Sequence, residues 1–211
     1  MKSVSSYMLV LNEATFVRHA IHSVLRYVDE LLVIDGGSSD CTRDIVTEIA
    51  SIDRRVRLEV WPQSGVPYTA AWHEPTVRNT AMTKLAHDWV LTLDADEVLE
   101  ADENLFRSLD EPAVLTRLNL VSYSRYIHRM GVQLWYPDSQ LRFYNRRNAV
   151  YPPQALHSIA TQANGQPMPF VTVDATLWHY NGIVKPRRQW LADNPTAFTS
   201  LPCQRRAPVT L

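Results

Sequence analysis

Short apolar segments alternate along the first hundred residues with stretches in which apolar residues recur every three or four positions. The apolar segments are typical of buried strands, and the spaced stretches are typical of amphipathic helices. We therefore predict four strands, at Tyr7–Leu11, Leu31–Ile34, Val56–Val60 and Trp89–Leu93. Predicted helices lie between them, among them Thr42–Ala50 and Val77–Ala86. This alternation predicts an α/β fold with a parallel sheet and helices on both of its faces.

The sequence changes character after residue 112. Stretches rich in β-formers, Val114–Ile127 and Gln140–Tyr144, are mixed there with several prolines. We predict antiparallel strands and loops that cover the open end of the parallel sheet. Because no linker separates the two parts, we expect a single domain over residues 1–211, with halves at 1–112 and 113–211.

The two parts of the chain also differ in charge. Residues 1–116 hold 10 Lys and Arg against 19 Asp and Glu, whereas residues 117–211 hold 11 against 3. A basic second half predicts an anionic partner, although solvated surface charge is the alternative. No apolar run approaches the roughly 18 residues that span a bilayer, and the first ten residues do not resemble a signal peptide. We therefore expect a cytoplasmic location.

Carboxylates follow two of the predicted strands directly. Asp35 ends the second strand, and Asp94-Ala95-Asp96 follows the fourth. In parallel α/β sheets ligands bind beyond the carboxyl ends of the strands. Paired carboxylates at such a place suit Mg²⁺ or Mn²⁺ bridged to substrate phosphates, or a ribose hydroxyl. The alternative is that these residues form turns or cap helices.

Four separated segments carry characteristic residues in a fixed order. They are Asn12-Glu13, Val33–Thr42, Val77–Asn79 and Trp89–Glu97. In this order they resemble the family 2 glycosyltransferases of GT-A fold, over roughly residues 5–100. A second set, Trp135–Tyr144, His157 and Leu177–Tyr180, is similar to the branch that includes lipopolysaccharide-core glucosyltransferases. The sequence departs from these relatives at Gly36 and Ser158, where many of them carry an acidic residue.

The resemblance implies a GT-A, Rossmann-like α/β fold, with a mainly parallel sheet flanked by helices and a β-rich C-terminal part on the acceptor side. Residues 1–112 would then be the nucleotide-sugar-binding half and 113–211 the acceptor-binding half. The implied reaction moves a sugar, with inversion, from a nucleotide-diphosphate donor to an acceptor hydroxyl. We expect a uridine-linked donor.

The resemblance also assigns residues to the donor. Asp35 and Gly37 would contact the base or ribose, Asn12 and Glu13 would line the same pocket, and Arg78 would bind diphosphate oxygens. For Asp35 the alternative role is a turn cap, and for Arg78 a surface salt bridge. Glu13 could instead lie in the first turn of a helix and interact with its dipole.

The metal-diphosphate centre would lie at Asp94, Ala95 and Asp96. The resemblance implies that Asp94 and Asp96 hold Mn²⁺ or Mg²⁺ and that His179 completes the metal shell or binds the diphosphate. A histidine in so apolar a run could equally be a core residue. His157 is assigned to the same donor site, with the acceptor as an alternative ligand.

Deprotonation of the acceptor hydroxyl requires a base within hydrogen-bond reach. Asp138 is the candidate, and its alternative role is an ion pair with Arg142 or another neighbour.

An anionic acceptor would use the basic residues of the second half, and it would be a phosphorylated or lipid-linked glycan reached at the inner membrane surface. Nucleic acid ranks second as a partner. The residues concerned are Arg125, Arg129, Arg142, Arg146, Arg147, Lys185, Arg187 and Arg188.

Two other classes of protein remain open from the sequence. A sugar-nucleotide nucleotidyltransferase shares a similar sheet but usually needs a glycine-rich phosphate loop with arginine near its start, and Met8–Arg18 has none. A non-catalytic module that binds a sugar nucleotide or carbohydrate would use the same carboxylates without turnover.

Overall fold

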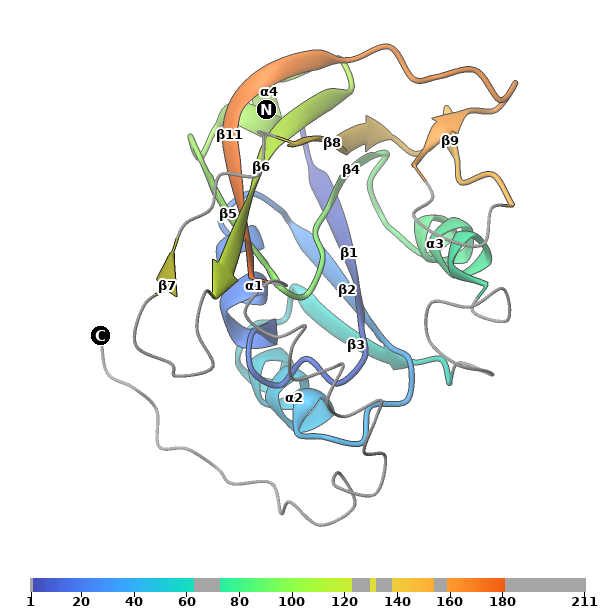
Figure 1. Ribbon diagram of the computed structural model, residues 1–211. Helices are drawn as coiled ribbons and strands as arrows, with labels where there is room; N and C mark the ends of the chain where they lie inside the picture. The colour runs from blue at the N-terminus through green and yellow to red at the C-terminus, as the bar shows by residue number, and fades with distance from the viewer. Residues whose placement is uncertain (1, 63–72, 123–129, 132–137, 154–158, 181–211) are drawn as a thin grey trace.

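The computed structural model describes residues 2–62, 73–122, 130–131, 138–153 and 159–180 (Figure 1). Up to residue 92 the described elements are β1 Val4–Val10, α1 Val17–Val24, β2 Glu30–Asp35, α2 Thr42–Ile52, β3 Val56–Val60, α3 Glu74–Thr83 and β4 Trp89–Thr92. They are followed by β5 Glu97–Ala101, α4 Leu105–Ser108, β6 Ala113–Ser122, β7 Met130–Gly131, β8 Asp138–Asn145, β9 Ala149–Val150, β10 Thr161–Gln162 and β11 Val171–Tyr180. No described helix has the length and apolar character needed to cross a membrane.

The first four strands form the parallel part of the sheet, in the order β3-β2-β1-β4. This confirms the α/β class and the four strands predicted from the apolar segments. The third helix begins at Glu74, three residues before the predicted start at Val77. Pro75 in its first turn explains the earlier start, because proline is favoured where the helical N–H groups need no partner.

The second half extends this sheet instead of only covering its open end. Strand β8 pairs antiparallel with β4 on one side and with β6 on the other, and β11 and β5 follow at the far edge. The predicted antiparallel strands are therefore present, within one mixed sheet. Because β8 runs against β4, its first residues lie at the edge of the sheet where β4 ends. Strand β5 begins and strand β11 ends at the same edge.

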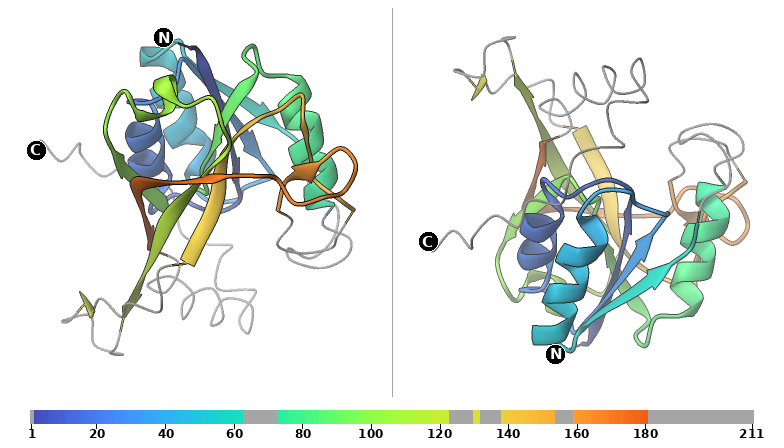
Figure 2. Two further views of the ribbon diagram at one scale, coloured as in Figure 1. Left: turned by 90° about the horizontal axis from the view of Figure 1, so that it is seen from above. Right: turned by 90° about the horizontal axis from the view of Figure 1, so that it is seen from below.

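Helices cover both faces of the parallel part (Figure 2). Strands β1 and β2 alternate their side chains, so that Met8 and Val33 pack toward α1 and α2 while Tyr7 and Leu32 pack toward α3. Strands apolar on both faces are expected in a parallel sheet that helices cover on both sides.

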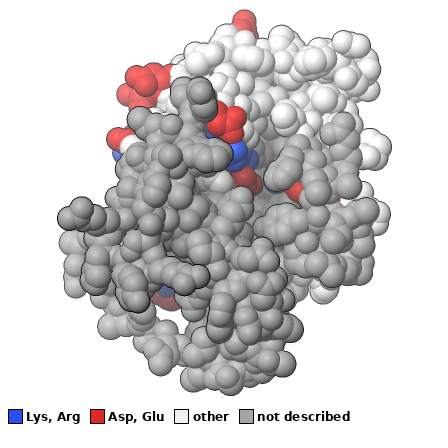
Figure 3. Space-filling model, in the orientation of Figure 1, with Lys and Arg blue, Asp and Glu red and all other residues white. Residues whose placement is uncertain are grey.

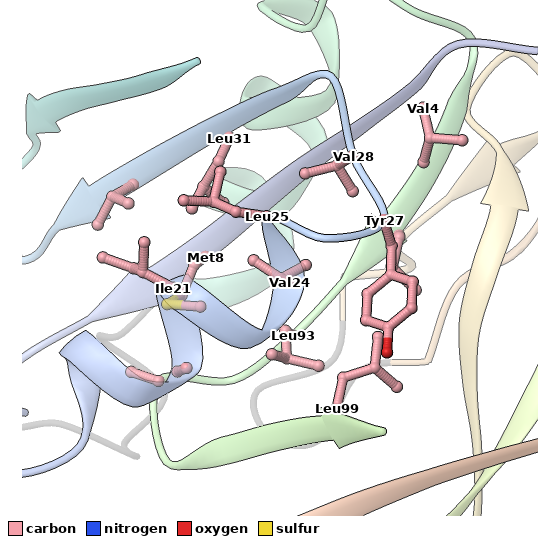
Figure 4. Packing of buried hydrophobic residues seen from close by; sticks show 14 of the residues in the cluster. Val4, Met8, Ile21, Val24, Leu25, Tyr27, Val28, Leu31, Leu93 and Leu99 are labelled. Atoms are coloured by element: carbon pink, nitrogen blue, oxygen red, sulfur yellow. The ribbon is translucent and has the colours of Figure 1, made fainter. Parts of the chain in front are cut away.

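Helix α1 is amphipathic and turns its apolar stripe to the sheet (Figure 4). Val17, Ala20, Ile21 and Val24 recur at helical spacing and are fully buried. Burial of a side chain such as Ile21 contributes about 1.5–3 kcal/mol. Because α1 follows the loop at the end of β1, its packing positions that loop against the sheet.

Candidate active site

Asp35 ends β2 with its side chain fully buried. Its Oδ1 accepts hydrogen bonds of 2.8 Å from the backbone N–H groups of Gly37 and Ser38. Gly37 has a φ of +102°, a left-handed conformation that glycine adopts at little cost. Asp35 therefore does cap its own turn. Its Oδ2, however, is buried without a hydrogen-bond partner among the described residues.

Asn12 holds the loop after β1 against the loop after β2. Its Oδ1 accepts from the N–H groups of Ser39 and Asp40, at 2.8 and 3.3 Å, and its own N–H donates to Ser38 Oγ. Asn12 is also the one non-glycine residue with positive φ in the described part of the chain, at +57°. Asparagine tolerates this conformation better than most residues. Its side chain thus holds the two loops together.

Glu13 is buried beside the same loops, and its N–H donates to Thr42 Oγ1 at 2.8 Å. Its carbonyl accepts from the N–H of Val17, the first residue of α1. Glu13 therefore lies in the loop before α1. The alternative placement in the first turn of the helix is wrong.

The turn between β4 and β5 places Asp94, Ala95 and Asp96 at the same edge of the sheet as Asp35. Two hydrogen bonds close it: the Asp94 N–H donates to Glu97 Oε2, and the Glu97 N–H donates to the Asp94 carbonyl, both at 3.1 Å. Ala95 is buried, and the Asp94 side chain is about one third exposed. Glu97, the first residue of β5, is fully buried.

Arginines from distant elements contact both oxygens of Asp94. Arg142 Nη2, from β8, lies 2.8 Å from Oδ2, and Arg78 Nη2, from α3, lies 3.4 Å from Oδ1. Burial opposes ionisation, but the charges of Arg142 and Arg78 outweigh it and hold the pKa of Asp94 well below its ordinary value. Arg78 also pairs with Glu74 at 2.7 Å. It thus lies beside Asp94, and its ion pairs are largely buried instead of lying at the surface.

A buried group of three tyrosines lies beside Arg78. The hydroxyls of Tyr7, Tyr144 and Tyr151 hydrogen-bond one another at 2.9–3.2 Å. The Arg78 guanidinium lies over the rings of Tyr7 and Tyr151, at 5.9 and 5.4 Å from their centroids. Such cation–π contacts are attractive and restrict where the guanidinium can lie. The sequence pattern did not indicate this group, because its members come from β1, β8 and the segment after β9.

Asp96 and His179 form a separate pair. Asp96 Oδ2 lies 3.5 Å from His179 Nε2, and the Tyr180 N–H donates to the Asp96 carbonyl at 2.9 Å. Both side chains are about one tenth exposed. A carboxylate next to an imidazole fits a divalent cation that takes its remaining ligands from substrate phosphates and water. Within the described ranges no group of three His, Cys, Asp or Glu side chains surrounds a common metal position.

Asp138 begins β8 and lies at the same edge as Asp94. Its Oδ2 accepts from Arg117 Nη2, in a short contact, and from Gln140 Nε2 at 2.8 Å. Its side chain remains 42% exposed, so that a ligand can reach it. The alternative role that the sequence left open, an ion pair, is present, although the partner is Arg117 and not Arg142.

Sequence reasoning missed the roles of Glu97, Arg117 and Arg142. Arg142 was expected to serve an anionic acceptor, and that expectation is wrong: Arg142 is buried and contacts both Asp94 and Glu97. Arg146 and Arg147 pair with Asp88 at 3.4 and 2.8 Å. A signal for Arg142 existed in its place within an apolar strand, because a buried charge requires a partner. His157, Arg125, Arg129, Lys185, Arg187 and Arg188 lie outside the described residues.

Acidic and basic side chains adjoin one another near the middle of the face shown in Figure 3. A cavity of about 540 Å³ lies elsewhere, at the opposite edge of the sheet, where β4 begins and β8 ends. Trp89, Asn145 and Gln162 are among the residues that line it. Arg147, which was expected to serve an anionic acceptor, also lines it, but none of the predicted donor, metal or base residues within the described ranges does. The candidate site and this cavity are therefore distinct.

Comparison with known proteins places the chain in a family. The model of Glycosyl transferase family 2 matches residues 5–170. A TPR repeat-containing protein of Synechococcus elongatus is 36% identical over 135 residues, which cover 59% of this chain and 30% of that protein. An uncharacterized glycosyltransferase of Rickettsia bellii is 28% identical over 156 residues, covering 71% of this chain and 48% of that protein. The chain thus spans less than half the length of these relatives.

Among solved structures, the crystal structure of residues 1–349 of S. aureus TarS has a similar fold. The TM-score is 0.54 at 13% sequence identity, and the match covers 92% of this chain and 66% of that one. This likeness agrees with the expected GT-A fold. Because the family match extends over most of its 211 residues, the chain belongs to glycosyl transferase family 2.

Proposed function

We propose that this chain carries the donor site of a glycosyltransferase that moves a sugar from a nucleotide-diphosphate donor to an acceptor hydroxyl, with inversion and with Mn²⁺ or Mg²⁺ bound. The observation that carries the proposal is the meeting of Asp35, Asp94, Asp96 and Asp138 at one edge of the sheet. Family membership supports glycosyl transfer as the chemistry.

The nucleoside is assigned to the loop of Asp35. Buried polar atoms normally have hydrogen-bond partners, so the Oδ2 atom of Asp35 suits an N–H of a base or a ribose hydroxyl. Uracil, which offers one ring N–H, is the base that we propose. The Asn12 contacts keep the loop in the conformation that presents this oxygen.

The diphosphate is assigned to the turn after β4. Asp96 and His179 would hold the divalent cation, which supplies positive charge to the leaving diphosphate. Arg78 and Arg142 flank Asp94 and add fixed positive charge next to this position. Each oxygen of Asp94 already contacts an arginine, so we assign Asp94 to the ribose or to holding the arginines.

Asp138 is assigned as the base that accepts the proton of the acceptor hydroxyl. Its exposure leaves room for an acceptor, and the contacts with Arg117 and Gln140 fix the orientation of its carboxylate. The anionic acceptor stays a prediction, because the arginines of the second half that the structure describes pair with acids of the chain itself.

Titration calorimetry with uridine diphosphate, with and without Mn²⁺, tests the donor site, and release of free sugar from a uridine-diphosphate sugar tests turnover. We expect binding that Mn²⁺ strengthens and slow hydrolysis of the donor. Guanosine and thymidine diphosphates serve as controls for the base. Binding without turnover on any acceptor would favour a non-catalytic module, and the absence of binding would refute the donor site.

The variant Asp138→Asn separates the base from the donor site. Removing a general base costs about 10²-fold or more in rate, so we expect transfer to slow by that factor with unchanged affinity for uridine diphosphate. The amide keeps the shape of the side chain and loses its basicity. Weaker nucleotide binding with normal turnover of bound donor would instead assign Asp138 to the donor.

A further inference from the structure

Five side chains form a row of alternating charge across the candidate site. In order they are Asp94, Arg142, Glu97, Arg117 and Asp138, and we call them the charge row. Arg142 Nη2 lies 2.8 Å from Asp94 Oδ2 and 2.6 Å from Glu97 Oε1. Arg117 Nη1 lies 3.8 Å from the same Glu97 oxygen, and its Nη2 contacts Asp138 Oδ2.

Glu97 is the middle member of the charge row and the one farthest from solvent. Its side chain is fully buried, whereas those of Asp94 and Asp138 are 34% and 42% exposed. A substrate can therefore reach the two ends of the row but not its centre. Glu97 also accepts the Asp94 N–H through Oε2, so both of its oxygens are engaged.

We propose that Glu97 is a positioning residue that holds Arg142 against Asp94 on the donor side and Arg117 against Asp138 on the acceptor side. This inference rests on the proposed function for what the two ends of the row do. Glu97 touches neither substrate. Its effect on both substrates passes through the two guanidinium groups.

The geometry distinguishes this role from that of an ordinary stabilising ion pair. Arg142 contacts Asp94 and Glu97 with the same nitrogen, so any shift of Glu97 also changes the contact at Asp94. A buried charge that loses its partner is costly, and the arginine left behind would move toward another acid. Removal of Glu97 is therefore expected to pull Arg142 and Arg117 away from their present positions.

The chain offers a matched control in the pair of Arg107 and Asp29. The Arg107 guanidinium donates two hydrogen bonds, of 2.8 and 2.9 Å, to the Asp29 carboxylate. This pair lies near the start of β1 and away from the charge row. Asp29→Asn removes a carboxylate from an arginine just as Glu97→Gln does. A merely structural role for Glu97 predicts that both variants change the melting temperature and leave nucleotide binding and kcat unchanged.

The experiment compares Glu97→Gln and Asp29→Asn with the wild type in melting temperature, affinity for uridine diphosphate with Mn²⁺, and kcat at saturating donor. We expect Asp29→Asn to lower the melting temperature alone. Glu97→Gln is expected to weaken nucleotide binding and to lower kcat, each by about 10-fold or more. Equal behaviour of the two variants, with binding and kcat unchanged, would overturn the inference.

Two further measurements keep the test decisive if Glu97→Gln does not fold. Arg142→Lys is expected to weaken nucleotide binding more than it lowers kcat, and Arg117→Lys to do the reverse. If the two lysine variants changed nucleotide binding and kcat in the same way, the assignment of one end of the charge row to the donor and the other to the acceptor would be overturned. Crystal structures add a readout independent of activity, since unchanged Asp94, Asp138 and arginine positions in a folded Glu97→Gln protein refute positioning. A wild type that binds no nucleotide refutes the proposed function instead.

Discussion

The loop after β2 and the turn after β4 each present an aspartate at the same edge of the sheet, but they hold it by different means. Asp35 is held by backbone N–H groups two and three positions further along the chain. Asp94 is held by the guanidinium groups of Arg78 and Arg142, which lie 16 and 48 positions away. The first arrangement uses hydrogen bonds within one loop, and the second uses charges brought from other elements.

This difference matters for what each carboxylate can bind. A carboxylate held by backbone N–H groups, with one oxygen left over, suits a single directed hydrogen bond from a ligand. One held between two arginines lies beside fixed positive charge, which in the proposed function would face the diphosphate. The comparison predicts that substitutions at the two places affect different properties of donor binding.

The largest effect is expected at the turn after β4. Asp96→Ala should lower the rate of transfer by about 10³-fold, because the charge stabilisation that a metal supplies is worth several kcal/mol. Mn²⁺ should no longer strengthen binding of uridine diphosphate, as measured by titration calorimetry. Circular dichroism and the melting temperature report whether the fold is kept. If the wild type stays fully active with a chelator, and the Asp96→Ala variant is as active as the wild type, Asp96 is excluded as a metal ligand.

A smaller effect is expected at the loop after β2. Asp35→Asn should weaken binding of uridine diphosphate by about 10–100-fold, since a hydrogen bond to a charged group contributes about 1.5–3 kcal/mol. The factor by which Mn²⁺ strengthens binding should stay as in the wild type. If that factor disappeared as it should in Asp96→Ala, the two regions would not act separately and the comparison would fail.

The pH dependence of stability should show whether arginine charges stabilise the Asp94 carboxylate. Its pKa is lowered in the folded protein, so its contribution to stability is present above the unfolded value, near 4, and is lost as the pH falls through the folded value. Asp94→Asn should therefore melt below the wild type at pH 7, and the gap should narrow below about pH 4. Melting curves of both proteins from pH 7 to pH 3 measure it. A gap that stays constant with pH would mean that the arginine charges do not stabilise Asp94.

The smallest effect is expected from Asn12→Gly. Glycine accepts the positive φ of this position without strain, but the acceptor for the N–H groups of Ser39 and Asp40 is lost. We expect a loss of about 1 kcal/mol, or about 2–4 °C in melting temperature. Asn12→Ala adds backbone strain to the same loss and should be less stable than Asn12→Gly. The opposite order would show that the positive φ of this position does not strain an alanine.

The sequence predicted the parts of the site whose geometry is set by near neighbours. The strand that ends at Asp35, the glycine at position 37 and the turn at Asp94 can all be recognised from residues close by. Arg142 could not be assigned in this way, because its contact with Asp94 depends on β8 pairing with β4 in one particular register. A shift of one residue in that register would turn Arg142 to the other face of the sheet.

The same limit explains why Glu97 and Arg117 were missed. Strand β5 was not predicted, since its partner among the described strands is β11, more than 70 residues later in the chain. The alternative left open for Asp138 was an ion pair with Arg142 or another neighbour, whereas Arg117 reaches it across the pairing of β6 with β8. Pairings between distant segments carry little local signal, and they decide most of the contacts within the charge row.

The place of β8 has a consequence for how the protein is made. Strand β4 is synthesised about fifty residues before β8, and until then one of its edges has no neighbour from the second half. An open strand edge can pair with another chain, and non-local pairings form slowly. A nascent chain that has emerged only as far as β6 therefore exposes this edge while Asp94 still lacks Arg142. Until β8 arrives, this edge of β4 is open to pairing with another chain.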